Sequence, residues 1–236
     1  MRILRNRGNR IKEQFEGERV FQSMPGKVYY PVNLDLLGKP CVIVGGGLVA
    51  VRKARSLLSF GAKVTVISPA LGKGMLGLFR SGQVLWVKRK YWPGSIKGFF
   101  LGIAATNDPV VNAAVAKYGM SRNMLVNVVD VPKMCNFIVP SVLRQGDLVI
   151  SVSTSGKSPM VAQQLKNEIK DLVGSHYASL IKMLGSARPR IQSMHASMAK
   201  RKAVYRQILG SPILELLQQG KLRQASRMLD VFIEAT

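Results

Sequence analysis

Apolar and polar positions divide the chain into two parts with different periodicities. In the first part, strand-length apolar runs alternate with segments of helical length, and the runs lie at 40–45, 63–68, 83–88, 99–106 and 124–129. Continuous apolar runs of this length indicate strands buried on both faces, and the segments between them suit crossover helices. The pattern therefore predicts an α/β fold in which helices cover both faces of a doubly wound parallel sheet.

The pattern changes beyond the fifth apolar run. Short apolar segments at 137–140 and 148–153 predict two strands, and the turn residues 145–147 lie between them. Ser158 and Pro159 then provide a suitable N-cap and first turn for a helix. We expect a small α+β region in this part of the chain.

The remaining chain has the periodicity of helices. Apolar residues recur at intervals of three and four, as at Ile213, Leu216, Leu217, Met228, Leu229 and Phe232. This spacing places them on one face of a helix, so a helical C-terminal domain is the simplest interpretation. Glycine and proline predict breaks between its helices at Gly174, 185–189, 210–212 and Gly220.

The first apolar run ends in three glycines that open a helix-compatible segment. Gly45, Gly47 and Ala50 occupy the fixed positions of a G-x-G-x-x-A pattern. Gly45 suits a tight turn, and Gly47 lets a pyrophosphate approach the backbone, while the helix N-terminus offers free N–H groups to the phosphates. We therefore predict a Rossmann-like dinucleotide site; an ordinary strand-to-helix turn without a ligand is the alternative.

Two further strand ends carry candidate site residues. Ser68 follows the second strand, where most NAD sites have an acid, so the residue weakens an NAD prediction and leaves NADP open. Ser68 and the backbone of Pro69 and Ala70 can still contact an adenosine. Asp130 follows the fifth strand, at the edge where open α/β sheets bind ligands, and is a candidate general base; a loop or cap aspartate is the alternative.

A hydroxyl-rich loop with a lysine precedes the helix predicted after Pro159. Residues 154–159 contain Gly156-Lys157-Ser158, but Ser151 stands where a phosphate-binding loop needs its first glycine. The Walker A interpretation therefore fails. The loop suits a carboxylate bound at a helix N-terminus, and helix capping alone is the alternative.

Charge is the property of the composition that restricts the partners most. The sequence has 35 Lys and Arg against 12 Asp and Glu, which gives a net charge of +23. Such an excess indicates an acidic partner, namely nucleic acid, anionic lipid or a polyanionic small molecule, or else a solvated basic surface. Because the charges are spread along the chain, a dedicated nucleic-acid tail is not indicated.

Several other sites and locations are not indicated. No apolar run reaches the ~20 residues of a membrane span, and the polar, basic N-terminus lacks the apolar segment of a secretion signal. Cys41 and Cys135 do not make a disulfide framework, so a cytoplasmic location is expected. His176 and His195 lack further ligands at metal-binding spacing, so we predict no metal site.

The ordered set of motifs over residues 29–172 resembles the precorrin-2 dehydrogenase/sirohydrochlorin ferrochelatase family. This family also forms the N-terminal module of bacterial sirohaem synthases. The residues that carry the resemblance are Tyr30-Pro31-Val32, 42–54, 61–66, 104–108, 127–130, 132–133, 136–140 and 153–159. No single motif is decisive, whereas the order of the whole set is specific.

The resemblance implies an NAD-dependent oxidation of precorrin-2 to sirohydrochlorin, and some members also insert ferrous iron to give sirohaem. Asp130 matches the family's catalytic aspartate, and Thr154 matches a serine in the active-site cleft of some members. The family has neutral residues at the position of Ser68. The resemblance implies cofactor contacts at Leu48, Val49, Pro69 and Ala70. We expect Thr106 to lie near the nicotinamide.

The resemblance also accounts for the basic composition, because the tetrapyrrole substrate is a polycarboxylate that a basic cleft attracts. Lys133, Arg144 and Lys157 lie near the predicted site in sequence and are candidate partners of its carboxylates. Neither nucleic acid nor a membrane is expected as a partner of such an enzyme.

The resemblance and the patterns together predict four parts of the chain. They are a basic flexible N-terminal extension over 1–28, a dinucleotide-binding Rossmann domain over 29–136, a dimerisation region over 137–173 and a helical C-terminal domain over 174–236. Family members are homodimers in which residues like 137–173 exchange across the interface.

Two other functions remain open from the sequence. One is an NAD-responsive regulator that binds nucleic acid through the basic surface, although no helix-turn-helix signature is evident. The other is a cleft that inserts or carries a metal without redox chemistry. A dehydrogenase assay discriminates between these functions and the oxidation of precorrin-2.

Overall fold

The computed structural model describes residues 27–234, so nearly all of the extension predicted over 1–28 lies outside the described residues. The chain divides into two compact units, Met1–Val139 and Pro140–Thr236. Each unit is considered by itself below.

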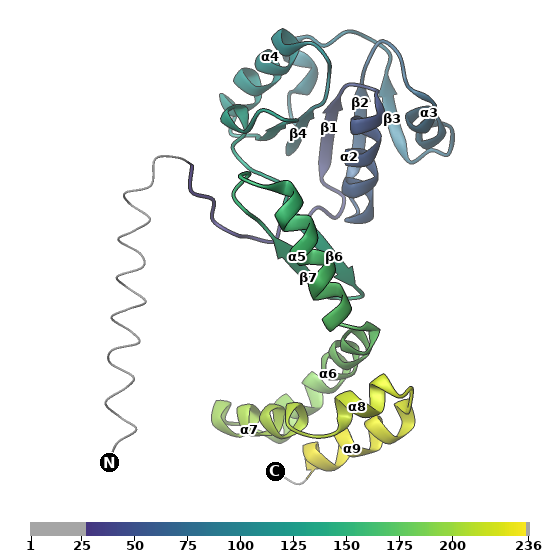
Figure 1. The fold of residues 1–236 in the computed structure, drawn as a ribbon, viewed down its shortest axis with the longest axis vertical. Helices are drawn as coiled ribbons and strands as arrows, with labels where there is room; N and C mark the ends of the chain where they lie inside the picture. Colours follow the sequence, from purple (N-terminus) through teal and green to yellow (C-terminus); the bar gives the residue numbers. More distant parts are fainter. Residues whose placement is uncertain (1–26, 235–236) are drawn as a thin grey trace, which may run out of the picture. The chain divides into compact units, whose positions relative to one another are not determined.

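The first unit is built on a five-stranded parallel sheet (Figure 1). Its strands run in the spatial order β3-β2-β1-β4-β5. Val44 pairs with Ile67 on one side and with Ala104 on the other, so the carboxyl ends of the three central strands meet at one edge. The strands are β1 (Pro40–Val44), β2 (Lys63–Ile67), β3 (Val84–Val87), β4 (Leu101–Ala104) and β5 (Leu125–Val128).

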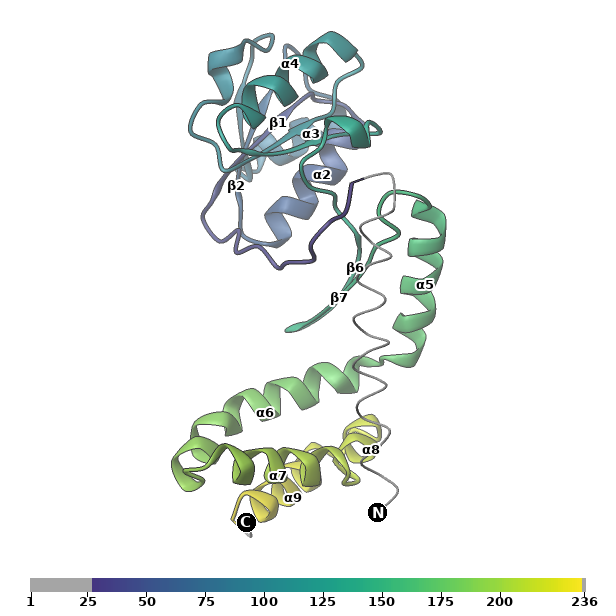
Figure 2. The same cartoon turned by 90° about the vertical axis from the view of Figure 1, so that its left-hand side faces the viewer.

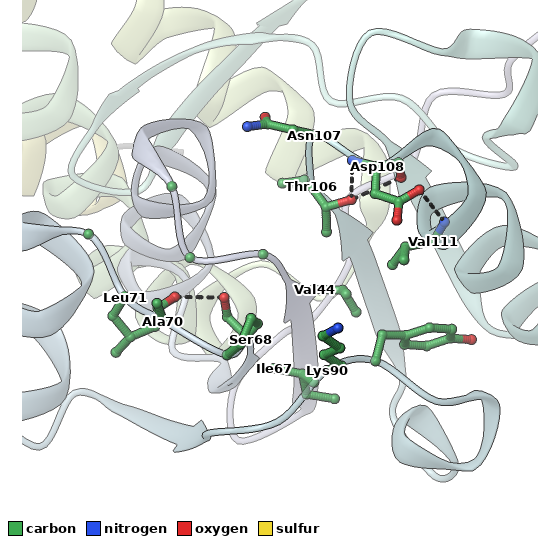
Figure 3. Close-up of a pocket in the computed structure, with 17 residues that line it drawn as sticks. Val44, Ile67, Ser68, Ala70, Leu71, Lys90, Thr106, Asn107, Asp108 and Val111 are labelled. Carbon is green, nitrogen blue, oxygen red and sulfur yellow. Dashed lines mark hydrogen bonds between the residues drawn. The ribbon is translucent and has the colours of Figure 1, made fainter.

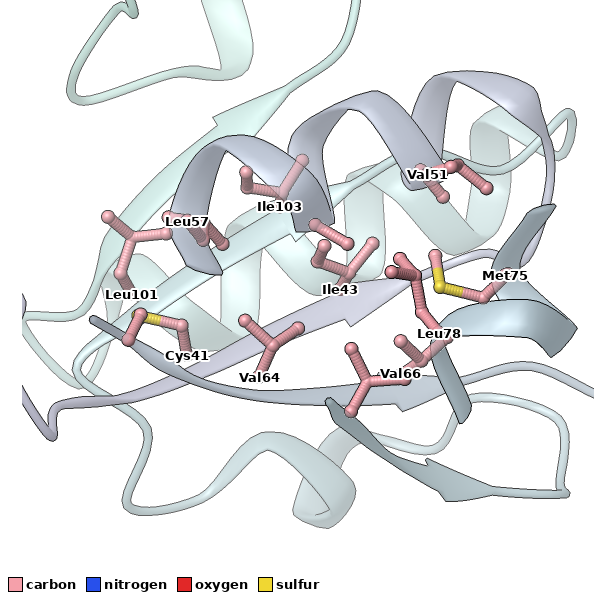
Figure 4. Packing of buried hydrophobic residues seen from close by; sticks show 14 of the residues in the cluster. Cys41, Ile43, Val51, Leu57, Val64, Val66, Met75, Leu78, Leu101 and Ile103 are labelled. Carbon is pink, nitrogen blue, oxygen red and sulfur yellow. The ribbon is translucent and has the colours of Figure 1, made fainter. Parts of the chain in front are cut away.

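Helices cover both faces of this sheet, which confirms the predicted doubly wound architecture. On one face, α2 (Leu48–Ser59) and α3 (Lys73–Arg80) bury their apolar sides against the strands, as Figure 4 shows for Val51, Leu57 and Met75. On the other face, α4 (Pro109–Met120) packs over β4 and β5. Two short 3₁₀ turns complete the unit, η1 (Pro93–Ile96) and η2 (Pro132–Met134).

The second unit begins with an antiparallel hairpin and continues as helices (Figure 2). The hairpin strands β6 (Ser141–Gln145) and β7 (Leu148–Val152) pack against α5 (Pro159–Leu172). Ser158 caps α5, as predicted, by accepting a hydrogen bond from Val161 N–H. The helices that follow are α6 (Ser175–Met194), α7 (Met198–Leu209), α8 (Ile213–Gln218) and α9 (Leu222–Glu234).

The strand predicted at 137–140 is wrong. The carbonyl oxygen of Phe137 accepts a hydrogen bond from the side chain of Asn127 rather than from a strand partner, and the Phe137 ring packs on the first core. Pro140 has no N–H to donate to a ladder. The hairpin therefore begins one residue later, at Ser141.

The helix break predicted at 185–189 is also wrong, since α6 continues through Pro189. A proline inside a helix removes one hydrogen bond and crowds the carbonyl four residues earlier, which here belongs to Gly185. Ala187 and Ile191, on either side of Pro189, are buried in the helical core, so tertiary packing holds the helix together. The break falls instead at buried His195, whose Nε2 lies 2.9 Å from the carbonyl oxygen of Ile233.

The described residues contain no helix that is both long enough and apolar enough to cross a membrane. Cys41 and Cys135 are both buried and free. The carboxyl edge of the parallel sheet in the first unit, with the loops that follow its strands, holds the candidate site.

Candidate functional site

A pocket of about 650 Å³ lies at the carboxyl edge of the parallel sheet (Figure 3). The loops that follow β1, β2, β3 and β4 all contribute to its lining. This is the edge at which open α/β sheets bind ligands. The pocket brings together most of the predicted cofactor residues, namely Gly45, Gly47, Ser68, Pro69, Ala70 and Thr106.

Backbone packing makes glycine necessary in the loop after β1. Gly45 has a φ of +122°, and a Cβ at this position would collide with the carbonyl of Ala105. A Cβ at Gly46 would collide with the carbonyl of Ala70. The motif pattern leaves position 46 unspecified, so sequence reasoning missed this second requirement.

Gly47 and the start of α2 face open space. A Cβ at Gly47 would meet no atom within 4 Å, and Gly47 N-caps α2 without any side-chain hydrogen bond. The first turn of α2 has no acidic residue. The free N–H groups and the positive end of the helix dipole are therefore available to an anion.

The predicted cofactor residues Leu48 and Val49 do not line the pocket with their side chains. Leu48 is 79% exposed, and Val49 is the second residue of α2. Their N–H groups belong to the free first turn, so a contact with a phosphate would run through the backbone.

The loop after β2 is fixed by two hydrogen bonds around Ser68. The buried Ser68 hydroxyl donates to the carbonyl of Ala70 at 2.7 Å, and the indole N–H of Trp86 donates to the carbonyl of Ser68 at 2.9 Å. The serine in the acid position therefore shapes the loop and adds no negative charge to this end of the pocket.

The loop after β4 is held by a buried amide. Thr106 Oγ1 donates to Asn112 Oδ1 at 2.8 Å, and Asn112 Nδ2 donates back to the Thr106 carbonyl at 3.0 Å. Asp108 caps α4 by accepting hydrogen bonds from Val110 and Val111 N–H. The carboxylate of Asp108 is thus engaged in capping, although the residue lines the pocket.

Sequence reasoning missed Lys90 and Tyr91, which line the same pocket from the loop after β3. The Tyr91 hydroxyl is buried without a hydrogen-bond partner among the described residues, and burial raises its pKa, with Tyr118 acting in the same direction. The signal that could have found both residues is the basic, aromatic run 88–92 directly after a strand.

Asp130 lies two residues beyond β5 in a left-handed conformation, with a φ of +60°. Non-glycine residues rarely adopt this region, and aspartate and asparagine tolerate it best. Its side chain is exposed, and the carboxylate forms no hydrogen bond or ion pair within residues 27–234. A strained, unpartnered carboxylate at a ligand-binding edge is a candidate for chemistry.

The turn that carries Asp130 is fixed by Cys135 and Asn136. The buried Cys135 thiol accepts from Val128 N–H at 3.2 Å and lies 3.3 Å from the carbonyls of Val128 and Val131. Asn136 accepts from Val126 N–H at 2.7 Å and donates to the carbonyl of Met124 at 2.8 Å. These bonds return the chain beside β5 and leave Asp130 at the bend.

A lysine distant in sequence holds the other side of this turn. Lys27 Nζ donates to the carbonyls of Cys135 at 2.6 Å, Lys133 at 3.0 Å and Pro132 at 3.4 Å. The ammonium therefore binds the carbonyl end of η2, where a helix favours positive charge.

The predicted substrate-binding residues are divided between the units. Lys133 is exposed on η2, three residues after Asp130. Arg144 lies on β6, and Thr154 and Lys157 lie in the loop before α5. Thr154 Oγ1 accepts from Ser158 N–H at 3.0 Å and donates to the Ser158 carbonyl at 2.9 Å, so this hydroxyl stabilises the loop.

Within the part of the chain that the structure describes, no three His, Cys, Asp or Glu side chains gather as they would to hold a metal ion. The chemistry that the described site offers is therefore a phosphate cradle, a pocket without free negative charge and a carboxylate at the same sheet edge.

This fold and pocket define a dinucleotide-binding α/β protein, and comparison with known sequences agrees. A family model for NAD(P)-binding domains matches residues 32–141. Models of the central part of sirohaem biosynthesis proteins and of the sirohaem synthase dimerisation region match residues 145–172 and 176–231. The chain belongs to the family of the sirohaem synthase N-terminal module.

Individual relatives are named as sirohaem synthases. Siroheme synthase 1 of Aeromonas salmonicida is 35% identical over 210 residues, which are 88% of this chain and 45% of the relative. Siroheme synthase of Photobacterium profundum is 34% identical over 88% of this chain and 44% of its own length. The chain thus spans less than half the length of these curated relatives.

A solved structure named SirC, precorrin-2 dehydrogenase, is similar over almost its whole length. It superposes with a TM-score of 0.70 at 25% identity, and the match covers 86% of this chain and 99% of that chain. The resemblance found in the motifs therefore extends to the fold of both units.

Proposed function

We propose that this protein oxidises precorrin-2 to sirohydrochlorin with NAD as the oxidant. The observation that carries the proposal is the similarity to a precorrin-2 dehydrogenase over 99% of that chain. The intact phosphate cradle at Gly45, Gly46 and Gly47 supports it from the structure.

The residues around the pocket fit a dinucleotide. The free N–H groups at the start of α2 suit the pyrophosphate, because no side chain caps this helix and a Cβ at Gly47 would project into open space. Ser68, Pro69 and Ala70 line the end of the pocket at which the adenosine is expected, and Thr106 lines the end near β4. When bound, NAD supplies the acceptor for a hydride.

Asp130 acts as the base in this proposal. The oxidation removes two electrons as a hydride, and a proton leaves the macrocycle in the same overall reaction. An unpartnered carboxylate at the carboxyl edge of the sheet can accept that proton. Lys133, Arg144, Thr154 and Lys157 are the proposed contacts of the substrate, and reversing the charge of any of the three cations should raise the apparent KM for precorrin-2.

We also propose that the protein acts as a homodimer. The family model of the dimerisation region covers residues 176–231, which supports association of two copies. The exchange of residues 137–173 across the interface stays a prediction from the resemblance.

Ferrous iron is a proposed second substrate, inserted into sirohydrochlorin after the oxidation. The test follows the absorbance of the purified protein with precorrin-2 and NAD, first alone and then with Fe²⁺ or Co²⁺. Formation of sirohydrochlorin and NADH in the first stage supports the dehydrogenase, and a further spectral change with metal supports insertion. Absence of NADH formation at any precorrin-2 concentration would refute the proposed oxidation.

A further inference from the structure

The first unit holds a second ionisable group that the site described above does not include. Lys53 is on α2, the helix whose first turn borders the cofactor pocket, and its side chain is half-buried. In the described part of the chain, its ammonium has no hydrogen bond and no ion pair. Burial lowers the pKa of Lys53, with the charge of Arg52 acting in the same direction, whereas Asp130 and Cys135 oppose that shift.

Packing of the first core places Lys53 and Asp130 on the same side of the sheet. Ala50 and Ala54 of α2 are buried in a cluster against which Val129 and Phe137 also pack. Lys53 directly precedes Ala54 and Val129 directly precedes Asp130, so the segments that carry the two charged groups meet the same apolar cluster. The charge of Asp130 acts to raise the pKa of Lys53, as expected of a carboxylate on this side of the sheet.

The position along α2 relates Lys53 to the cofactor. Lys53 is five residues beyond the first residue of α2, which corresponds to about 7.5 Å along the helix axis. Partial burial of an ammonium without an anion raises the free energy of the protein through desolvation. A charge-assisted hydrogen bond to a ligand carboxylate would offset part of that free energy. The exposed Asp130 does not form such a bond with it in this structure.

We propose that Lys53 binds a carboxylate of the tetrapyrrole and thereby holds the macrocycle between the glycine loop after β1 and Asp130. This inference rests on the proposed oxidation of precorrin-2. Lys53 is a substrate-binding residue in this arrangement, separate from the exposed cations Lys133, Arg144 and Lys157. The ligand class is a polycarboxylate macrocycle, whose peripheral carboxylates extend beyond the reacting carbons.

The experiment compares the wild type with Lys53→Met, Lys53→Arg and the matched control Arg52→Met. Arg52 is an exposed cation one residue away on the same helix, so its loss changes the net charge equally. We expect Lys53→Met to raise the KM for precorrin-2 and the Kd for sirohydrochlorin by about 10- to 100-fold, as for loss of a charged hydrogen bond. Lys53→Arg should recover part of that loss, and Arg52→Met should stay near the wild type.

Two further readouts make the outcome decisive. The Kd for NAD and the thermal midpoint should be the same in Lys53→Met and the wild type, which separates substrate binding from damage to the fold. Equal KM values in Lys53→Met and Arg52→Met, or a fall in kcat without a rise in KM, would overturn the role of Lys53. A wild type that binds sirohydrochlorin but never reduces NAD would instead refute the proposed oxidation, and the Kd ratio would still test Lys53.

Discussion

At the scale of single residues, the backbone conformation of Asp130 restricts what can replace it. Aspartate, asparagine and glycine tolerate its φ of +60°, whereas the backbone of most other residues is strained in this conformation. Asparagine therefore removes the negative charge while it keeps the conformation of the turn. Alanine would change the charge and the backbone energy together.

We expect Asp130→Asn to lower kcat of precorrin-2 oxidation by roughly 10²- to 10⁴-fold, the range for loss of a general base. The Kd for NAD should not change, because Asp130 does not line the cofactor pocket. Single-turnover formation of NADH measures the chemical step, with Asp147→Asn in the β6–β7 turn as the control. A rate equal to that of the wild type would remove Asp130 from the chemistry.

Burial makes the thiol of Cys41 unreactive. Cys41 is fully buried in β1, and burial raises its pKa from 9.0 to about 11. Because the folded-state pKa lies above the unfolded one, this group leaves stability unchanged below about pH 9 and lowers it as the pH rises toward 11. A thiol reagent at pH 8 should detect neither cysteine in the native protein and both after denaturation.

A comparison of the wild type with Cys41→Ala isolates the pH effect. The difference between their free energies of unfolding should be constant from pH 7 to 8.5 and should shrink above about pH 9, as the unfolded wild type begins to ionise. Chemical denaturation at each pH measures this difference. A difference that grows with pH would contradict the assigned direction of the pKa shift.

At the scale of elements, the strand and helix pattern of the first unit was predictable because each element is regular. All five parallel strands lie where apolar runs indicated, and α2 begins directly after the glycines of the predicted motif. The two errors, at 137–140 and 185–189, arose where contacts with distant segments override the local preference.

Parts of the candidate site depend on contacts that no local pattern contains. The pocket residues at Gly45, Ser68 and Thr106 follow strands, so the parallel sheet alone brings them together. By contrast, Lys27 reaches the turn at 132–135 across more than a hundred residues. Such a pairing is set by the tertiary fold and was not predictable from the sequence.

We expect Lys27→Met to loosen the turn after β5. The substitution removes the donor for three carbonyl groups, which water can replace only in part, and should cost roughly 1 kcal/mol of stability. Hydrogen exchange over residues 131–136 should become faster, and kcat should fall less than in Asp130→Asn. Lys97→Met, at an exposed lysine, is the control, and equal exchange in both variants would contradict the role of Lys27.

At the scale of the whole molecule, the net charge of +23 sets the response to salt. Surface ion pairs contribute little to stability: Arg190 pairs with Asp230 at 2.6 Å and with Glu234 at 3.5 Å, but all three side chains are largely solvated. The large positive excess should act mainly on the encounter with an anionic substrate.

The KM for precorrin-2 should therefore rise steeply between 50 and 500 mM salt, because the Debye length falls from above to well below about 10 Å. The KM for NAD, which carries far less charge, should change less. Steady-state rates at constant pH measure both KM values. An unrelated basic protein without the pocket is the control for nonspecific adsorption of the substrate. An unchanged KM for precorrin-2 would show that the charge serves another partner.

The hydrogen bond from Trp86 to the carbonyl of Ser68 has an optical consequence. Trp86 also contacts Phe79 edge-on, with ring centroids 5.5 Å apart, and the ammonium of Lys88 lies 5.6 Å from its ring. The sequence has one other tryptophan, Trp92, which follows the pocket residue Tyr91. Trp86 thus adjoins the Ser68 end of the pocket, and Trp92 follows a residue that lines it, so the tryptophan emission spectrum should report occupancy of the site without any attached label.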